Sequence, residues 1–419
     1  MLQRSINQSQ SRWKFLWQPW QDIDWLLLIA VVGITIFGGI VIRSTELSEQ
    51  LTDWRQHWII GGIGLVTAMA LARWRYDNLT RTFWIIYALT NLSLLSVIFL
   101  GTEALGAQRW ITIGGFNIQP SEFAKIGMII TLAGLLHERT ASTIPAIVQT
   151  LSIAAVPWFL VFIQPDLGTS LVFGAITLVM LYWANANPGW LVLMISPLVS
   201  AILFSVFFPA WVVWAILMGV IAWKTMPWPF YSTVGAMLVN LASGGLGQVF
   251  WNLLQDYQKD RLILFLDPDK DPLGGGYHLI QSRIAIGAGQ LWGQGLNQGT
   301  QTQLSFIPEQ HTDFIFSAVG EELGFVGCMA MLIAFWLICL RLVLIAQNAK
   351  DNFGSLLAVG VLAMLVFQVL VNIGMTIGLA PVTGIPLPWM SYGRSALLTN
   401  FIAIGLVESV ANHRHRLRF

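Results

Sequence analysis

Charged residues are scarce in this sequence. Asp, Glu, Lys and Arg together make up 10% of its 419 residues, whereas hydrophobic residues make up 56%. Because soluble domains are about one-quarter charged, the composition excludes an ordinary soluble domain and indicates a protein embedded in a membrane. The formal net charge of +1 argues against a nucleic-acid partner, whose binding requires a strongly basic surface.

Cysteine is nearly absent as well. Cys328 and Cys339 lie eleven residues apart in one apolar stretch, which in a helix separates them by roughly 16 Å, too far for a disulfide within that helix. They therefore say nothing about the compartment. The sequence also contains no HExxH, CxxC or GxSxG motif, so the short signatures of zinc peptidases, thiol redox proteins and serine hydrolases do not apply.

Long apolar stretches, in contrast, are abundant. A membrane-spanning helix needs about 20 mostly apolar residues, and the sequence contains twelve candidates, with ten or eleven as the alternative counts because 210–223 is short and 229–250 is rich in glycine. We therefore predict an all-α, polytopic integral membrane protein of about twelve transmembrane helices. The candidates are residues 25–42, 58–72, 82–101, 119–136, 143–163, 167–184, 189–208, 210–223, 229–250, 314–338, 355–377 and 395–412.

The orientation follows from the basic residues of the short loops, which concentrate on the cytoplasmic side of a membrane. With the N-terminus in the cytoplasm, the short outer loops hold only Arg43, Arg55, Arg109 and Arg394. Both termini are then cytoplasmic. The predicted organisation is a cytoplasmic segment 1–24, nine transmembrane helices in 25–254, a large extracytoplasmic loop 255–313, three further helices in 314–412 and a basic cytoplasmic tail 413–419.

Several polar stretches fall on the outer side in this topology. They are residues 106–122, 163–170, 380–395 and the long loop that ends in HTD. A loop of about sixty residues in a compact protein is more often functional than decorative. The sequence therefore predicts a site that faces the outer leaflet.

Asp313 is the last residue before an apolar helix. It could cap that helix, since Asp is a preferred N-cap residue that also suits the helix dipole, and a functional role is compatible with capping. Ser317, Gly320 and Gly324 follow on the same helix face, a small-residue stripe that allows another helix to approach closely. We expect this packing to hold the carboxylate still.

Glu321 and Glu322 lie about two turns deeper in the same span. Ionisable groups inside a span are costly and usually face a cavity or a partner. A structural ion pair and a catalytic role are both open for them, and we expect them to support the helix.

Glu122 and Lys125 are spaced i,i+3 and share a helix face. They could form an intrahelical salt bridge, or Lys125 could face an anionic headgroup while Glu122 holds it. Arg109 could add a second cation, because guanidinium suits phosphate oxygens. Asp166 again precedes a span, where capping is the simple explanation and a place in the cavity is the alternative.

Arg283 lies among spaced glycines that do not form a nucleotide-binding loop, because no βαβ unit surrounds them. They are expected to permit tight turns in a re-entrant stretch. His311 and Asp313 could ligate a divalent cation such as Mg²⁺ or Mn²⁺, but two ligands are too few for a tight site, so we expect no tightly bound cofactor. This inventory suits an enzyme acting on an amphiphile with an anionic head, and equally a transporter.

A set of ordered motifs carries a resemblance to a known family. GAQRWI, QPSEFAK, QPDLGTS, DYQKDRLILFLDPDKDPLGGGYHLIQSRIAIG, GTQTQLSFIPEQHTDFIF, EELGFVG and PLPWMSYGRS together resemble the SEDS family (shape, elongation, division and sporulation) along most of the chain. The stretch before HTDF is similar to the elongation branch, with the division branch as the alternative. Family members usually have ten spans, so 185–254 would contain an inserted pair of helices. Arg394 stands where the family generally has glycine.

The resemblance implies a peptidoglycan glycosyltransferase of the bacterial inner membrane that polymerises lipid II. In the family the aspartate of HTDF is essential for polymerisation, and here it is Asp313. The resemblance also implies a class B penicillin-binding protein as partner, together with MreC, MreD and the MreB filament. A lipid II flippase and a non-catalytic scaffold are the alternatives of other classes.

On this basis we predict that Asp313 is the general base that deprotonates the acceptor sugar hydroxyl, a role worth about 10²–10⁴-fold in rate. Cations would stabilise the leaving pyrophosphate. The candidates are Arg109, Lys125 and Arg283, and the further residues predicted to line the substrate cavity are Glu122, Asp166, His311 and Ser391.

Overall fold

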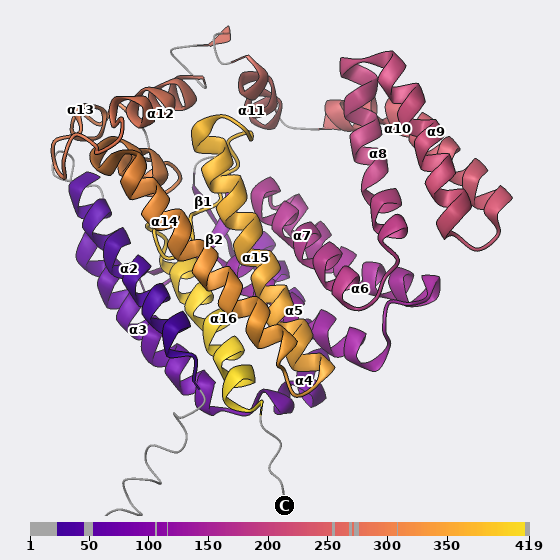
Figure 1. Ribbon diagram of the computed structural model, residues 1–419, viewed down its shortest axis with the longest axis horizontal. Coiled ribbons are helices and arrows are strands. Elements are labelled where there is room, and N and C mark those ends of the chain that lie inside the picture. Colours follow the sequence, from indigo (N-terminus) through magenta and orange to yellow (C-terminus); the bar gives the residue numbers. More distant parts are fainter. Residues whose placement is uncertain are drawn as a thin grey trace, which may run out of the picture.

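The computed structural model describes residues 23–45, 53–104, 107–114, 116–253, 256–267, 270–271, 276–307 and 309–414 (Figure 1). Most of the predicted N-terminal segment (1–22) and the last five residues of the predicted basic tail (415–419) lie outside these residues.

Every stretch predicted to span the membrane forms a helix. Mostly apolar residues, often with proline at the first turn, specify these helices, and the helices Ile144–Ile163 and Pro188–Val206 each tolerate an internal proline, Pro157 and Pro197. The bounds are α2 (Trp25–Thr45), α3 (Trp54–Arg73), α4 (Leu79–Leu100), α5 (Pro120–Glu138), α6 (Ile144–Ile163), α7 (Leu167–Trp183), α8 (Pro188–Val206), α9 (Phe208–Thr225), α10 (Pro229–Leu253), α14 (Ile315–Gln347), α15 (Asn352–Ile377) and α16 (Arg394–Asn412), and the short 3₁₀ helix η2 (Tyr76–Asn78) precedes α4.

Eight of the described helices are long and apolar enough to cross a membrane. They are α2, α4 with η2, α6, α8, α9, α14, α15 and α16, and α7 is a shorter apolar helix. The fold is therefore that of a polytopic helical membrane protein. The count of twelve spans stays a prediction, because α3, α5 and α10 carry more polar residues.

The central helices are α15 and α16, which are mostly buried within the protein. α15 packs against α14, α7 and α5, and α16 packs along α3. The helices α16 and α3 approach each other closely: a Cβ added to Gly405 of α16 would lie only 2.7 Å from the Cα of Ala68 in α3. A glycine here lets the two backbones approach, as small residues do between membrane helices.

The first and last described helices meet at one end of the molecule. The backbone N–H of Asp24, just before α2, donates to Oε2 of Glu408 in α16 at 2.9 Å, and Arg341 of α14 forms an ion pair with Asp24 at 2.5 Å. The start of α2 and the end of α16 therefore lie side by side, and the number of membrane crossings between them stays a prediction.

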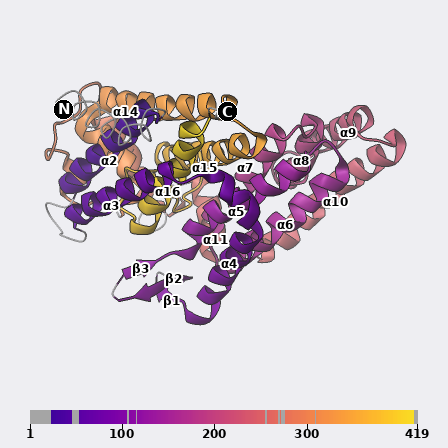
Figure 2. The ribbon, with the colours of Figure 1, turned by 90° about the horizontal axis from the view of Figure 1, so that it is seen from below.

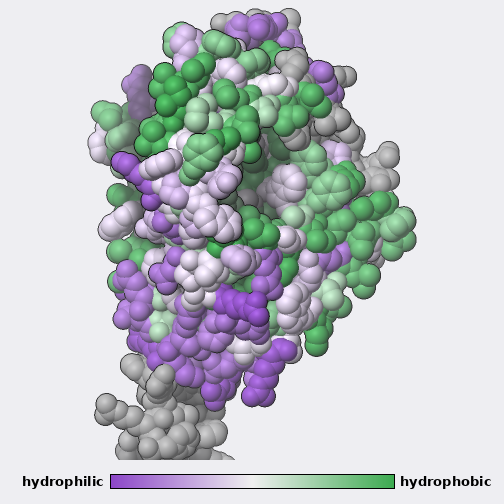
Figure 3. Space-filling model, turned by 90° about the vertical axis from the view of Figure 1, so that its right-hand side faces the viewer, coloured by the Kyte–Doolittle hydropathy of each residue, from purple (hydrophilic) through white to green (hydrophobic). Residues whose placement is uncertain are grey.

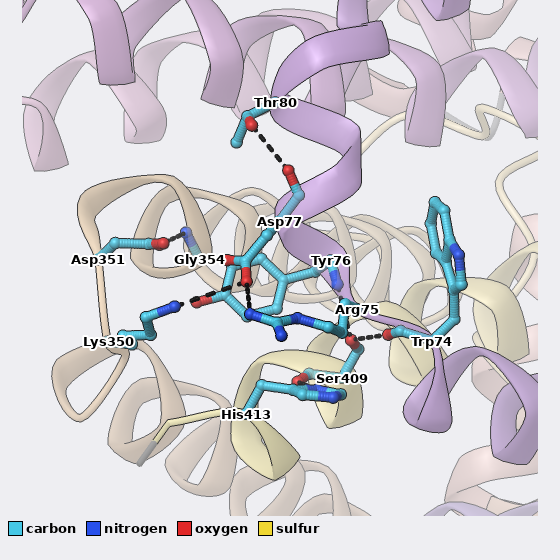
Figure 4. A network of polar contacts seen from close by, with 10 residues as sticks. All are labelled: Trp74, Arg75, Tyr76, Asp77, Thr80, Lys350, Asp351, Gly354, Ser409 and His413. Atoms are coloured by element: carbon cyan, nitrogen blue, oxygen red, sulfur yellow. Dashed lines mark hydrogen bonds and ion pairs between the residues drawn. The ribbon is translucent and has the colours of Figure 1, made fainter. Parts of the chain in front are cut away.

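A second polar network lies at this end (Figure 4). Asp77, between α3 and α4, accepts from Arg75 at 2.9 Å and lies 3.5 Å from Nζ of Lys350, between α14 and α15. Ser409 of α16 accepts from the backbone N–H of Tyr76 at 3.2 Å. Figure 3 shows hydrophilic residues gathered at the lower end of the molecule and hydrophobic residues over much of the surface above it.

α8, α9 and α10 form a group of their own beside the other helices (Figure 1). They pack mainly on one another, and α7 is their main neighbour outside the group. A buried polar centre joins α10 to α8. The side-chain amide of Asn240 in α10 donates to Ser196 at 3.0 Å, and the backbone carbonyl of Asn240 accepts from Ser200 at 2.6 Å. This group occupies most of the segment 185–254 in which the inserted helices were predicted.

A small antiparallel sheet, which was not predicted, accompanies the otherwise helical fold. Its strands are β1 (Thr102–Ala104), β2 (Ala107–Ile113) and β3 (Phe116–Ile118), in that order, and it projects from the helices (Figure 2). β-branched residues of β2 favour a strand, and Gly114 (φ +57) turns the chain towards β3. The sequence predicts only a polar stretch here, because each strand is too short to give a clear alternating pattern.

The long loop contains three helices, α11 (Asp256–Leu266), α12 (Tyr277–Ala288) and α13 (Thr300–Gln303), at the opposite end from the C-terminus (Figure 1). The predicted tight turns occur after α12 rather than within it, at Gly293 (φ +80) and Gly295 (φ +102). They lie against a kink in α14, where Gly324 (φ +65) leaves the helical conformation.

Candidate functional site

Asp313 lies in a tight turn just before α14. The backbone N–H groups of Thr312, Asp313 and Phe314 all donate to the carbonyl of Glu309, at 3.1–3.3 Å. Phe314, not Asp313, occupies the N-cap position, and no side chain caps this helix end. The capping interpretation of Asp313 is therefore wrong: the turn commits its backbone to Glu309 and leaves the carboxylate available to a cavity.

That cavity has a volume of about 320 Å³ and is enclosed by α11, α12, the start of α14 and the segment after α15. Charged or titratable groups line one part of it and apolar side chains the rest. Such a mixture fits a ligand with a polar head and an apolar body. The lining residues are Asp260, Arg261, His278, Glu309 and Asp313 among the former, and Leu264, Phe265, Leu279, Phe314, Ala380 and Val382 among the latter.

The surroundings shift the protonation of the titratable groups in this cavity. The pKa of Asp313 is raised to about 6: burial contributes most of the rise, the negative charge of Glu309 adds to it, and Arg261 and Arg109 oppose it. Burial lowers the pKa of His278, so its ring is neutral at pH 7. A carboxyl with a pKa near neutrality can both take up and release a proton under physiological conditions.

The segment between α15 and α16 closes the site on the other side of Asp313. A Cβ on Gly384 would lie 3.6 Å from Oδ2 of Asp313, so this glycine faces the carboxylate. Ser391 donates to the carbonyl of Thr312 at 2.5 Å and accepts from the N–H of Leu387 at 2.8 Å. Ser391, predicted to contact substrate, thus holds two backbone segments together beside Asp313.

Arg109 reaches the site region from β2. Its guanidinium donates to the carbonyl of Gln164 at 3.4 Å and to that of Pro165, and its charge is close enough to influence Asp313. The sheet therefore brings Arg109 to the segment before α7, on the same side of the molecule as Asp313.

Asp166 is the N-cap of α7, which confirms the capping interpretation. Its carboxylate accepts from the N–H of Thr169 at 3.2 Å, from Nε2 of Gln119 at 3.2 Å and from the hydroxyl of Ser121 at 3.4 Å. It is buried and does not line the Asp313 cavity. Asp166 therefore ties α7 to the start of α5.

Glu122 and Lys125 form the intrahelical salt bridge that their spacing predicts. Nζ of Lys125 lies 2.7 Å from Oε2 of Glu122, and the side chains are 1% and 4% exposed. Neither lines the Asp313 cavity. In this conformation Lys125 neutralises a buried carboxylate.

Arg283 and His311 occupy the edges of the region. Arg283 is exposed on α12 and donates to the carbonyl of Gly378 at 3.3 Å, outside the cavity lining. His311 lies 3.9 Å from Glu309, and its carbonyl accepts from the N–H of Tyr392 at 2.9 Å. Among the described residues, no three or more His, Cys, Asp or Glu side chains cluster as metal ligands would, so a divalent cation at His311 and Asp313 stays a prediction.

Glu321 and Glu322 have the supporting roles expected of them. Glu321 accepts from the N–H groups of Gln301 and Thr302, at 2.8 and 2.9 Å, and from the hydroxyl of Thr302 at 2.5 Å. Glu322 accepts from the hydroxyl of Ser44 at the end of α2. These carboxylates fasten the long loop and α2 to α14. The small-residue stripe packs against α12, where Ser317 and Ser282 share a hydrogen bond of 2.6 Å.

Five polar residues of the site were not predicted: Asp260, Arg261, His278 and Glu309 line the cavity, and Asn372 donates to the carbonyl of Asp313. The first four lie within motifs that carry the family resemblance, but their spacing along the chain gives no sign that they meet. Asn372 lies inside an apolar helix, where one amide reads as an incidental polar residue. A signal was present only for Glu309, which stands four residues before Asp313.

The fold and the site together define a polytopic helical membrane protein with an amphiphilic, charged cavity at one end of its helices. A family model described as "Cell cycle protein" (FtsW, RodA and SpoVE) matches residues 22–213 and 209–416. The chain belongs to this family, the SEDS family, as its motifs indicated.

Similar proteins match over nearly their whole length. The peptidoglycan glycosyltransferase MrdB of Escherichia coli K12 is 34% identical over 400 residues, covering 94% of this chain and 95% of the relative. The peptidoglycan glycosyltransferase RodA of Treponema pallidum is 33% identical, covering 93% and 97%. The stage V sporulation protein E of Bacillus subtilis is 31% identical, covering 93% and 97%.

Solved structures share the fold. A chain from a peptidoglycan synthase complex that coordinates polymerization and crosslinking superposes with a TM-score of 0.72 at 28% identity, covering 95% of this chain and all of that chain. The rod shape determining protein RodA of Thermus thermophilus superposes with a TM-score of 0.63 at 24% identity, covering 95% and 99%.

Proposed function

We infer that this protein is a peptidoglycan glycosyltransferase that links lipid II units into glycan strands, with Asp313 as its general base. The activity follows from family membership and from relatives of that name that match more than nine-tenths of both chains. The observation that carries the role of Asp313 is its place in the amphiphilic cavity, half-buried and with a pKa raised to about 6.

The reaction joins two lipid-linked sugars. The acceptor hydroxyl attacks the anomeric carbon of the donor, a new C–O bond forms, and the bond from that carbon to the pyrophosphate oxygen breaks. The hydroxyl proton passes to the carboxylate of Asp313, and the lipid pyrophosphate leaves with the bonding electrons. A base whose pKa lies near the working pH is suited to this transfer, since it is ionised before the attack and basic enough to accept the proton.

The departing pyrophosphate gains negative charge, which preorganised cations would stabilise. Arg261 lines the cavity itself, and Arg109 lies close enough to act on Asp313. Arg261 and Arg109 are better placed to stabilise the pyrophosphate than Lys125, which is paired with Glu122, and Arg283, which donates to the Gly378 carbonyl. The apolar wall of the cavity would accommodate the first isoprene units of the lipid.

We assign the protein to the elongation branch and to rod-shape maintenance. The relatives named MrdB or RodA are 33–34% identical, and those named FtsW are 30–33% identical, so a division role is the alternative. The inferred partner is a class B penicillin-binding protein, in line with the synthase complex that shares the fold, within an assembly with MreC, MreD and MreB. The protein would reside in the inner membrane with its site facing outward.

A lipid II flippase is the competing function. Transporters place their charged groups near the membrane midplane, often at broken helices. Here Arg261, Glu309 and Asp313 gather at one end of the helix bundle, in and beside the long loop. This placement favours chemistry at the membrane surface.

The test supplies purified protein and its penicillin-binding partner with labelled lipid II. Wild type should form polymer, and Asp313→Asn should form none while remaining folded. Asp351→Asn is the matched control, because Asp351 caps α15 through the N–H of Gly354 at 2.8 Å and asparagine caps equally well. Movement of lipid II across vesicle membranes without polymer would favour the flippase, and polymer from Asp313→Asn would exclude the proposed base.

A further inference from the structure

Asn372 connects Asp313 to the segment that faces it. It lies in the last turns of α15 and is completely buried. Its Nδ2 donates to the carbonyl of Asp313 at 3.0 Å and to the carbonyl of Ile385 at 2.8 Å. A side-chain amide has two donor hydrogens, so both are used, one on each side of the proposed catalytic carboxylate.

The carbonyl of Asp313 is not part of the helical ladder of α14. The N–H of Ser317, four residues on, donates to the carbonyl of Phe314 at 2.9 Å. The N–H of Asp313 donates to Glu309 at 3.1 Å. Both backbone groups of Asp313 are therefore held: its N–H by Glu309 within the turn and its carbonyl by Asn372 of α15.

The second bond of Asn372 fixes the opposite wall. Ile385 follows Gly384, whose Cα faces Oδ2 of Asp313. One amide thus sets the spacing between the Asp313 turn and the residue that its carboxylate lies against. Ser391 makes a parallel connection to the preceding carbonyl, that of Thr312, at 2.5 Å. Two successive carbonyls of the turn are consequently held by α15 and by the segment that follows it.

We propose that Asn372 is a positioning residue that holds the Asp313 carboxylate at the height and angle needed to accept the proton of the acceptor hydroxyl. The proposal rests on the proposed function of Asp313. Asn372 lies in the membrane helix α15 and does not line the cavity. In this proposal it nevertheless controls the position of the Asp313 carboxylate. A displacement of about 1 Å in such a group costs about 100-fold in rate.

The test replaces asparagine by leucine, which has a similar shape and no donor. Asn372→Leu releases both carbonyls, and we expect kcat in the lipid II polymerisation assay to fall about 100-fold while KM stays within about twofold. Equal losses in kcat and kcat/KM identify an interaction that matters only in the transition state. A lower affinity for lipid II with unchanged kcat would overturn the proposal.

The matched control is Asn240→Leu in α10. Asn240 is also buried and donates twice, to Ser196 at 3.0 Å and to the carbonyl of Ala236 at 2.9 Å, but it lies in the α8–α10 group away from Asp313. It should lower the melting temperature and leave kcat of the folded fraction within about twofold. An equal loss of kcat in both variants would mean that general destabilisation is responsible, which overturns the proposal.

A second variant covers the case in which Asn372→Leu does not fold. Asn372→Ser keeps one hydroxyl donor and loses at least one of the two bonds, so its folded fraction should also show reduced kcat with unchanged KM. Wild-type kcat from this folded variant would contradict the proposal. If wild type itself makes no polymer, the proposed function fails; if wild type and the Asn372 variants polymerise equally, only the inference about Asn372 fails.

Discussion

Gly384 and Asp313 face each other across the cavity rim. Gly384 has φ +73, and a Cβ there would come within 3.6 Å of Oδ2 of Asp313. Space alone would allow alanine, but this backbone conformation disfavours it by about 1–2 kcal/mol. The glycine thus keeps the segment after α15 in a shape that passes close to the carboxylate.

Gly384→Ala should therefore reduce polymerisation more than it reduces stability. The strained backbone would relax by moving the segment, and the wall that faces Asp313 would move with it. We expect at least a tenfold fall in kcat, at the scale of a small displacement of catalytic groups, measured with labelled lipid II. Gly114→Ala is the control, because Gly114 has φ +57 with open space around it; it should cost stability with little loss of kcat. Equal activity of both variants would refute the prediction.

Polymerisation should depend on pH through Asp313. The base acts in its ionised form, and its pKa is raised to about 6, first by burial and then by Glu309. Because the carboxyl keeps its proton below this value, kcat should rise as the pH passes through about 6 and level off above it. Initial rates between pH 5 and 8 check this. A rate that is flat down to pH 5 would exclude the titration of Asp313 as the controlling step.

Neighbouring charges should move that midpoint in opposite directions. Glu309→Gln removes a negative charge that favours the protonated form of Asp313, so the midpoint should shift to lower pH. Arg261→Gln removes a positive charge that favours the ionised form, so the midpoint should shift to higher pH. The other charged or titratable groups near Asp313 are Arg109, Asp260 and His278. Shifts of the same sign in both variants would contradict this arrangement.

The buried pair of Glu122 and Lys125 should matter for stability. Lys125→Met leaves an unpaired carboxylate at a site with 4% exposure, which costs about 3–5 kcal/mol when one partner of a buried pair is removed. The double variant Glu122→Gln with Lys125→Met should recover much of that loss. Unfolding by denaturant in detergent measures both. If the double variant is as unstable as the single one, the pair is not what holds this part of α5.

Glu321 should control the order of the long loop. Its carboxylate accepts hydrogen bonds from Gln301 and Thr302. Glu321→Ala removes these bonds, which should lower the free energy of local opening at residues 299–304 by roughly 1–3 kcal/mol. Their amide hydrogen exchange should then be tenfold faster or more. Glu322→Gln is the comparison, since an amide oxygen can still accept from Ser44. Unchanged exchange at 299–304 in Glu321→Ala would show that other contacts fix this loop.

Local patterns predicted much of this protein. The apolar stretches predicted the twelve long helices with boundaries within four residues of those observed, except that α14 continues nine residues beyond 338, to Gln347. The i,i+3 spacing of Glu122 and Lys125 predicted their ion pair. The small-residue stripe after Asp313 predicted the close packing that α12 supplies. Other features could not be predicted, because they depend on contacts with parts of the chain outside the local pattern. Capping, one of the two interpretations of Asp313, is excluded because the turn closes on Glu309 and Phe314 takes the N-cap position. The strands β1–β3 were too short to be recognised.

The sequence by itself determined that the protein is an α-helical membrane protein, where its helices run and that Asp166 and Asp313 stand just before two of them, because hydrophobicity and helix formation are properties of contiguous residues. Only the tertiary structure decided which polar groups meet. Arg261 comes to Asp313 from α11, Glu309 from the turn that precedes α14, and Asn372 from α15. Their positions depend on how helices distant in the chain pack against one another, and no local pattern encodes that packing.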